Sequence, residues 1–380
     1  MKTQQLSYKN SLWSVYQTTP NFQNNQCQLV FIFGANEIVS EPAIYNYVYS
    51  QYPNANIVSA STAGEIIDKN VFDNTAVVTA IEFNSTQIQC VKTNITEHAS
   101  SEAAGKFLMN QFPEDGLKSV FIISDGTKIN GSELVLGINA NTPKGISVSG
   151  GLAGDAARFL QTSTGLNSVA SEGNLIAIGF YGNNIKVGHG SFGGWDEFGK
   201  ERKITKANKN ILYEIDGKSA LSLYKEYLGP FADELPGSAL LFPLSLKLEN
   251  SEKNLVRTIL SIDEKEQSMT FAGNMPEGST VRLMKANFQK LVEGASSAAN
   301  YAIQNMVTQP PQLAILISCV GRKLVLQSKT FEEVEAAKNI IGKNATITGF
   351  YSYGEISPMH SYLNCDLHNQ TMTITTFTEF

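Results

Sequence analysis

Three stretches of the chain share one pattern of apolar and polar positions. Each begins with a short continuous apolar run, continues through a segment with helical spacing, and ends in a second β-rich run that is followed by glycine and an acidic residue. Continuous apolar runs joined by a helix are typical of βαβ units whose strands are buried on both faces of a parallel sheet. The repeat predicts a mixed α/β fold with units over 29–65, 119–155 and 313–355.

The helix of the third unit has the clearest boundaries. Thr330 with Glu333 three residues later forms a capping-box pattern, apolar residues follow at helical spacing, and Gly342 marks the end. Similar but weaker start signals predict helices near 40–51 and 131–140.

Two further segments are expected to add antiparallel strands to these sheets. Residues 173–182 and 370–378 are apolar or alternating, and no helical segment separates them from the strand-like runs beside them. The predicted fold therefore has largely parallel or mixed sheets with antiparallel additions.

A change in composition predicts the domain division. Residues 188–203 are rich in glycine and polar residues, which favours a long loop, and a new strand and helix pattern follows. We therefore expect a lead-in over 1–27, a first α/β domain over 28–205 and a second over 206–380.

Composition and charge exclude several classes of protein. The 380 residues are 42% hydrophobic and 17% charged, which is enough apolar residue for real cores. The net charge is −6 and no lysine or arginine stripe occurs, so nucleic acid is not an expected partner. No apolar run has the length of a membrane span or the form of a signal peptide, which predicts a cytoplasmic protein without membrane insertion. The cysteines are few and widely spaced, as expected for reduced thiols.

Candidate binding residues lie where the predicted parallel strands end. Ligands of open α/β sheets gather beyond the carboxyl ends of the strands, and the three units end there in Glu65, Asp155 and Glu355. These acids are equivalent by position, although each can also serve only to cap its turn.

The third unit differs from the others because a cation, Arg322, follows its first strand. A guanidinium with Glu355 suits a zwitterion such as an amino acid, and Tyr351 and Tyr353 can supply apolar walls and hydroxyls. The alternative is an internal Arg322–Glu355 ion pair that fixes the rim of the sheet.

Several motifs together resemble the FIST family of bacterial sensory proteins. The similar stretches are IVSASTAGEI, SGGLAGD, LISCVGR, ITGFYSYGEISP and LHNQTMTIT, and the resemblance runs from about 28 to 378. The N-terminal hallmark of the family reads Gly-Cys-Ser/Thr-x-Gly-Glu, whereas residues 59–65 here read Ser-Ala-Ser-Thr-Ala-Gly-Glu. The C-terminal motifs of the family fall on Cys319, Gly321, Arg322, Tyr353, Gly354, Glu355, His368 and Asn369.

The resemblance implies an intracellular sensory input protein with paired N- and C-terminal FIST domains that binds a small ligand such as an amino acid. Because no output domain is recognisable, the expected partner is a separate signalling protein such as a histidine kinase or a cyclase. No cofactor and no catalysis are expected in this interpretation. Its ligand-binding residues are Arg322, Glu355, Tyr353, Tyr351, Gly354, Cys319, His368, Thr62, Glu65 and Asp155.

Three alternatives stay open. A heme-binding nitric-oxide sensor needs an axial histidine, for which His189 in the glycine-rich segment is the candidate. A hydrolase or transferase would use Cys319 with His368 as nucleophile and base. A zinc site from His360, Cys365 and His368 lacks a fourth ligand, so a turn that leads into a strand is the favoured interpretation there.

Overall fold

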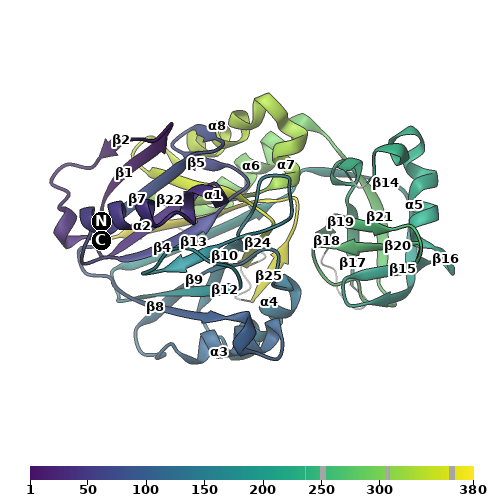
Figure 1. Ribbon diagram of the computed structural model, residues 1–380, viewed down its shortest axis with the longest axis horizontal. Coiled ribbons are helices and arrows are strands. Elements are labelled where there is room, and N and C mark those ends of the chain that lie inside the picture. Colours follow the sequence, from purple (N-terminus) through teal and green to yellow (C-terminus); the bar gives the residue numbers. More distant parts are fainter. Residues whose placement is uncertain (236, 249–253, 305, 307–308, 359–363) are drawn as a thin grey trace.

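The chain folds into a larger and a smaller lobe (Figure 1). The computed structural model describes residues 1–380 except 236, 249–253, 305, 307–308 and 359–363. The smaller lobe consists of residues 195–286, so it is an insertion into the larger lobe, which contains the chain on both sides of it.

The larger lobe contains three sheets, each built on one of the predicted βαβ units. In each unit two strands pair in parallel, and the strand that follows later in the chain pairs with the first of them in antiparallel orientation. The first sheet uses β1 (Lys2–Lys9), β2 (Leu12–Thr18), β3 (Leu29–Gly34), α1 (Asn36–Val39), α2 (Pro42–Gln51), β4 (Asn56–Ser61) and β7 (Ala76–Glu82). The second uses β8 (Gln87–Asn94), α3 (Ser101–Asn110), β9 (Leu117–Ser124), α4 (Gly131–Asn141), β10 (Ser147–Leu152) and β12 (Asn174–Tyr181). The third uses β13 (Ile185–Phe192), α6 (Phe288–Ile303), β22 (Leu313–Cys319), α7 (Val320–Leu326), α8 (Thr330–Ile341), β23 (Thr346–Ser352) and β26 (Met372–Glu379).

Each unit also sends its next strand into the sheet of another unit. After β4, β5 (Glu65–Ile67) pairs with β23 of the third sheet and with β6 (Asn70–Phe72). After β23, β24 (Gly354–Pro358) pairs with β10 of the second sheet and with β25 (Cys365–His368). After β10, β11 (Thr164–Leu166) pairs with β4 of the first sheet. The exchange closes a cycle, so the three sheets are related by an approximate threefold arrangement.

A cycle of backbone hydrogen bonds follows the same order. The N–H of Ala63 donates to the Tyr351 carbonyl at 2.8 Å, and the N–H of Tyr353 donates to the Leu152 carbonyl at 3.3 Å. The N–H of Gly154 completes the cycle by donating to the Ser61 carbonyl at 2.9 Å. These bonds identify which residues of the three units are equivalent.

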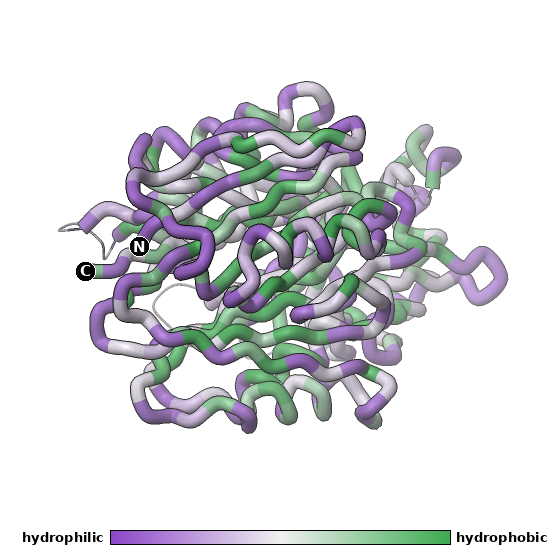
Figure 2. The backbone as a smooth tube through the Cα atoms, turned by 60° about the vertical axis from the view of Figure 1, so that its left-hand side comes forward, coloured by the Kyte–Doolittle hydropathy of each residue, from purple (hydrophilic) through white to green (hydrophobic). Residues whose placement is uncertain are grey.

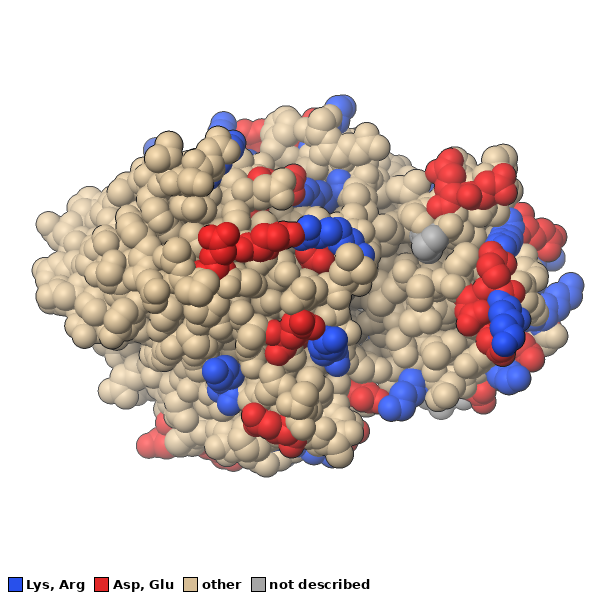
Figure 3. Space-filling view, viewed as in Figure 1, with Lys and Arg blue, Asp and Glu red and all other residues tan. Residues whose placement is uncertain are grey.

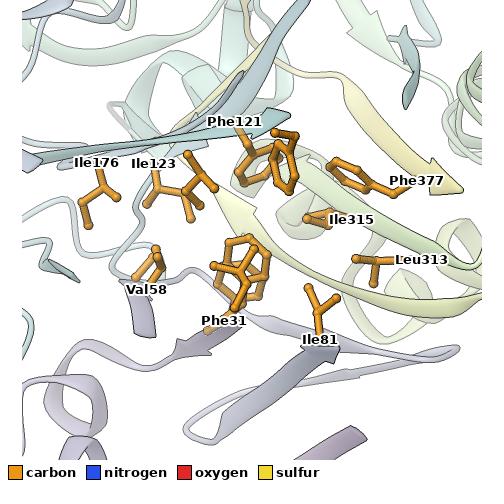
Figure 4. Close-up of a cluster of buried hydrophobic side chains, with 14 of the residues drawn as sticks. Phe31, Val58, Ile81, Phe121, Ile123, Ile176, Leu313, Ile315 and Phe377 are labelled. Atoms are coloured by element: carbon orange, nitrogen blue, oxygen red, sulfur yellow. The ribbon is translucent and has the colours of Figure 1, made fainter. Parts of the chain in front are cut away.

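The inner faces of the three sheets form the main core. Phe31 of β3, Phe121 of β9 and Ile315 of β22 are buried and converge between the sheets (Figure 4). The Phe31 and Phe121 rings meet edge to face with centroids 5.8 Å apart. Hydrophobic residues follow the central strands and hydrophilic residues gather in the outer turns (Figure 2). Burial of these faces accounts for the continuous apolar runs in the sequence.

The smaller lobe has its own β-rich architecture and core. Its strands lie in the order β18-β17-β21-β14-β15-β20-β19, and α5 packs beside them. The elements are β14 (Trp195–Asn208), β15 (Ile211–Ile215), β16 (Lys218–Ser219), α5 (Ala220–Leu228), β17 (Leu244–Lys247), β18 (Asn254–Arg257), β19 (Ile259–Asp263), β20 (Ser268–Phe271) and β21 (Thr280–Ala286).

The fold class predicted from the sequence is confirmed, and so are the helices expected near 40–51 and 131–140, which are α2 and α4. The segments 173–182 and 370–378 form the antiparallel strands β12 and β26. The long loop expected over 188–203 is wrong, because this segment contributes to β13 and β14. Residue 205 lies inside β14, and strands from both sides of it share sheets.

The capping box predicted at Thr330 is also wrong. The Thr330 side chain donates to the Gln327 carbonyl, and no side chain caps α8. Glu333 is buried and binds Arg322 instead of the helix terminus, because a buried guanidinium is a stronger partner than a backbone N–H.

Candidate ligand-binding site

A cavity of about 340 Å³ lies in the cleft between the two lobes, where the space-filling view is hollowed (Figure 3). The lining is aromatic, aliphatic or neutral and polar, and none of its residues carries a charge. The larger lobe contributes Gly126, Thr127, Ile129, Asn130, Leu152, Phe159 and Tyr353, and the smaller lobe contributes Asn210, Leu260, Ser261, Thr270, Phe271 and Ala272.

Direct contacts between the lobes fix the cavity walls. The Asn130 side chain donates to Asn274 Oδ1 at 3.1 Å, and the Asn274 N–H donates to Ser132 Oγ at 3.0 Å. Lys209 pairs with Glu133 at 2.7 Å at the edge of the same contact. Residues from α4 therefore hold the smaller lobe against the end of the second sheet.

Asp125 shapes the turn that begins the cavity wall after β9. Its buried carboxylate accepts hydrogen bonds from the backbone N–H groups of Thr127 at 2.7 Å, Lys128 at 2.8 Å and Gly173 at 2.8 Å. It also accepts one from the Thr162 hydroxyl at 2.8 Å. This network leaves Gly126 and Thr127 facing the cleft, and a Cβ at Gly126 would lie 2.0 Å from the Ala153 carbonyl oxygen, so only glycine fits there.

The connection after β10 is longer than its two equivalents. The Tyr351 N–H donates to the Gly64 carbonyl, and in the first sheet the Ser61 N–H donates to the Ser163 carbonyl in the same way. Ser163 is therefore equivalent to Gly64, and Gly154 is equivalent to Ala63. Ala63 and Gly64 are adjacent in the chain, whereas Gly154 and Ser163 are not. Residues 155–162 are an addition that only the second unit contains.

This comparison corrects one sequence-based equivalence. Asp155 is not the counterpart of Glu65 and Glu355, because it lies in the added segment. Thr164 occupies that position, since it pairs with Ala60 of β4 in the first sheet. In the same way Glu65 pairs with Phe350 and Glu355 with Gly151. The added segment could not be recognised from the glycine-acid motif, because the sequence around this motif is similar in all three units.

The added segment 155–162 is held in place and brings an aromatic ring to the cavity. Asp155 accepts hydrogen bonds from Arg158 Nε at 2.9 Å and from the Gln161 N–H at 3.3 Å. The Phe159 N–H donates to the Tyr353 hydroxyl at 2.9 Å, and the two rings stack with centroids 4.4 Å apart. Phe159 has a φ of 55°, a conformation that non-glycine residues rarely adopt. These contacts place the stacked pair at one wall of the cleft.

Glu65 and Glu355 are buried in matching hydroxyl clusters outside the cavity. Glu65 accepts from the Thr62 hydroxyl at 2.6 Å and the Thr75 hydroxyl at 2.6 Å. Glu355 accepts from the Ser352 hydroxyl at 2.6 Å and from a second threonine, Thr371, at 3.0 Å. Burial raises the pKa of Glu65 to about 7 and that of Glu355 to about 8, although the hydroxyl donors oppose the shift. Neither glutamate lines the cleft cavity.

Arg322 does not meet Glu355 at an open rim, so that prediction is wrong in both its forms. The Arg322 side chain is fully buried and binds Glu333 through Nε at 3.0 Å and Nη2 at 2.7 Å. Its remaining donors reach the carbonyl groups of Leu291, at 2.7 Å, and Gly193. Because α7 begins directly after β22, its first turn directs this side chain toward α8 rather than toward the cleft.

The other predicted residues divide between the cavity and the interior. Tyr353 lines the cavity, whereas the Tyr351 hydroxyl donates to Glu333 at 2.7 Å in the interior. Burial raises the pKa of the Cys319 thiol well above its usual range, which favours the thiol over the thiolate. His368 Nε2 lies 3.0 Å from the Ser357 carbonyl oxygen. Catalysis by Cys319 and His368 stays an untested prediction.

The heme and zinc alternatives gain no support from their residues. His189 Nε2 lies 2.8 Å from the Ser147 hydroxyl, and burial lowers the His189 pKa to about 4, so the ring is neutral. Heme binding at His189 stays a prediction. His360 lies outside the described residues, and among the residues that are described no three His, Cys, Asp or Glu side chains gather as a metal site requires.

The sequence did not point to Phe159, Asn130 or the residues of the smaller lobe. One signal was available for Phe159, because the segment between Gly154 and the next strand is longer than in the other two units. No sequence pattern indicated which strands of the insertion would face the second unit.

Two family models together match most of the chain. Residues 28–218 match the FIST N domain, and residues 220–358 match the FIST C domain. The chain belongs to the FIST family. FIST domains are sensory domains of signal transduction, so this FIST chain has a sensory role. The two family matches meet inside the smaller lobe, near β16 and α5.

Two solved structures to which this chain is similar have low sequence identity and low TM-scores. A chorismatase crystal structure is 9% identical over 99% of this chain and 98% of its own, with a TM-score of 0.35. A cyanuric acid hydrolase from A. caulinodans is 8% identical over 77% of this chain and 99% of its own, with a TM-score of 0.18. Neither likeness bears on the function of the FIST chain. No curated protein matches it.

In the part of the chain that the structure describes, no helix is both long enough and apolar enough to cross a membrane.

Proposed function

We propose that this FIST protein senses a small molecule that binds in the cleft between its two lobes. The observation that carries the proposal is the neutral cavity lined by three aromatic residues, Phe159, Phe271 and Tyr353. Its volume of about 340 Å³ lies at the lower end of the range usual for small-molecule pockets. Apolar walls with a few neutral polar groups favour a compact and largely uncharged ligand.

The cavity lies where ligand binding can alter the arrangement of the lobes. The second unit supplies one wall through Thr127 and Phe159, and the insertion supplies the other through Asn210 and Phe271. A ligand that contacts both walls stabilises the arrangement in which they are this close. We propose that a separate signalling protein, such as a histidine kinase or a cyclase, responds to that change.

An amino acid is the less favoured ligand class in this proposal. The expectation depended on Arg322, whose donors bind Glu333 and backbone carbonyl groups. In the cleft, the charged ends of an amino acid would meet only neutral groups such as Asn130 and Asn210, and burying charge without a charged partner is costly. Amino acids therefore belong in a ligand screen as a comparison with uncharged aromatic compounds.

A thermal-shift screen with a blocking variant tests the proposal. Ser261 is exposed at the cavity, so Ser261→Trp should fill the cleft without disturbing a core. Ser222→Trp, at an exposed position of α5 outside the cavity lining, is the matched control. A compound that stabilises the wild type should stabilise Ser222→Trp equally and should not stabilise Ser261→Trp. Equal stabilisation of both variants would place the ligand elsewhere. The same samples test for turnover, and we expect the ligand to be recovered unchanged.

A further inference from the structure

The buried side chain of Asn369 has no hydrogen-bond partner among the residues that the structure describes. The residue is 1% exposed, and both Oδ1 and Nδ2 of its side chain are unpaired there. Buried carboxamides in native proteins are almost always paired, because an unpaired buried polar group is costly. The missing partners therefore require an explanation.

The approximate threefold arrangement shows what a partner at this position looks like. Asn369 lies two residues before Thr371, as Asp73 lies two residues before Thr75, and each threonine donates to its buried glutamate. The residues between them, Asn74 and Gln370, share the left-handed conformation, with φ values of 55° and 62°. Asp73 and Asn369 are therefore equivalent positions.

Asp73 has a partner that Asn369 lacks. The Lys323 ammonium group binds Asp73 and also donates to the Ala63 carbonyl at 2.8 Å. The equivalent of Ala63 in the third unit is Tyr353, which lines the cleft cavity. In the first unit Lys323 of the chain itself therefore binds Asp73. In the third unit none of the described side chains binds Asn369 in the same way.

Asn369 does not line the cavity, but it lies near residues that do. A Cβ placed on Gly354 would lie 3.7 Å from Asn369 Nδ2 and 2.5 Å from Leu152 Cδ1. Leu152 lines the cavity, as does Tyr353, the neighbour of Gly354. Contact between the unpaired carboxamide and a molecule in the cleft requires a change of rotamer at Leu152.

We propose that Asn369 recognises a neutral amide group of the ligand. A carboxamide offers a donor and an acceptor side by side, and the group that complements both is another amide, either primary or in a lactam ring. The uncharged cavity lining disfavours a carboxylate at the same place. This inference rests on the proposed binding function of the cleft and adds the chemical class of its ligand: a small aromatic or cyclic amide.

Three small aromatic probes separate this chemistry from apolar filling. Benzamide carries the donor and the acceptor, acetophenone lacks the donor, and benzoate is charged. Ligand-observed NMR titration of the full chain should show benzamide binding about tenfold or more tightly than acetophenone and benzoate, because a site built for hydrogen bonding discriminates against analogues that leave its groups unpaired.

Variants assign that selectivity to Asn369. Asn369→Leu should reduce benzamide binding to the level of acetophenone and leave the urea midpoint equal to or above that of the wild type, because it removes a buried unpaired amide. Asn36→Leu, at a residue outside the cavity lining whose Oδ1 is also unpaired, should retain benzamide selectivity. Asn369→Ala gives the same test if the leucine variant does not fold.

The outcomes distinguish the two proposals. If benzamide binds no better than acetophenone, or if Asn369→Leu binds benzamide as the wild type does, the amide assignment is overturned. Loss of binding of every probe in Ser261→Trp would then still support the cleft as the binding site. Benzamide binding that persists in Ser261→Trp would overturn both.

Discussion

Replacement of Arg322 by methionine should destabilise the protein through the loss of a buried ion pair. The substitution keeps an unbranched side chain of similar length and leaves the Glu333 carboxylate, which is fully buried, without its cation. It also frees the carbonyl groups of Leu291 and Gly193, which lie on the two segments that flank the insertion. One substitution therefore weakens both α8 and the attachment of the smaller lobe.

The size of the effect follows from the burial of both partners. Removing one member of a buried, hydrogen-bonded pair costs about 3–5 kcal/mol, because the remaining charge is left without compensation. A surface pair contributes below about 1 kcal/mol, so Arg282→Met is the matched control: Arg282 pairs with Glu197 at 3.2 Å and its side chain is 42% exposed.

Urea unfolding at neutral pH, followed by circular dichroism, measures the difference. The Arg322→Met protein should lose about 3–5 kcal/mol of unfolding free energy, and the double variant Arg322→Met/Glu333→Leu should recover part of the loss because no unpaired charge remains. If Arg322→Met does not fold, Glu333→Gln leaves the cation unpaired and gives the same comparison. A loss below about 1 kcal/mol in either single variant would refute the assigned role of the pair.

Three further predictions follow from buried groups and close contacts. Since the folded-state pKa values of Glu65 and Glu355 are raised from 4.5 to about 7 and about 8, the folded state retains protons that the unfolded state loses. Their stabilising contribution is full below about pH 4.5 and falls as the pH rises toward about 8. In a pH series, the urea midpoint should therefore decline less steeply with pH in Glu355→Gln than in the wild type. An equal decline in the two proteins would contradict the raised pKa of Glu355. Gly126→Ala should lower the melting temperature because its Cβ would lie 2.0 Å from the Ala153 carbonyl oxygen. Gly237→Ala should change it little, because no atom of the described residues beyond its chain neighbours lies within 4 Å of its Cβ. Phe159→Ala should weaken the binding of any ligand in the cleft without changing the far-UV circular dichroism spectrum. An unaltered affinity would show that Phe159 is not part of the site.

The fold could be predicted from the sequence to the extent that burial on both faces leaves a local signal. The runs at β3, β9 and β22 are mostly apolar because each strand is covered by the central core on one side and by helices on the other. The exchange of β5, β11 and β24 between sheets could not be predicted, because a strand of three to five residues carries no information about its partner.

The candidate site was predicted only in part, since its decisive residues depend on tertiary contacts. Tyr353 lies in the cleft, as a residue at the end of a parallel strand should. Arg322 occupies a similar position in the sequence, yet the first turn of α7 directs it to Glu333. Whether a residue at a strand end faces the cleft thus depends on the direction of the turn that follows, and residue spacing does not contain that information.

Hydrogen–deuterium exchange of the full chain with and without benzamide tests the central claim most directly. The account predicts protection at 126–130 and 152–160 of the larger lobe together with 260–272 of the smaller lobe, because these segments line the cavity from both sides. Protection confined to the segments around Glu65 or Arg322, or no protection at a saturating concentration of benzamide, would contradict the assignment of the cleft as the sensory site.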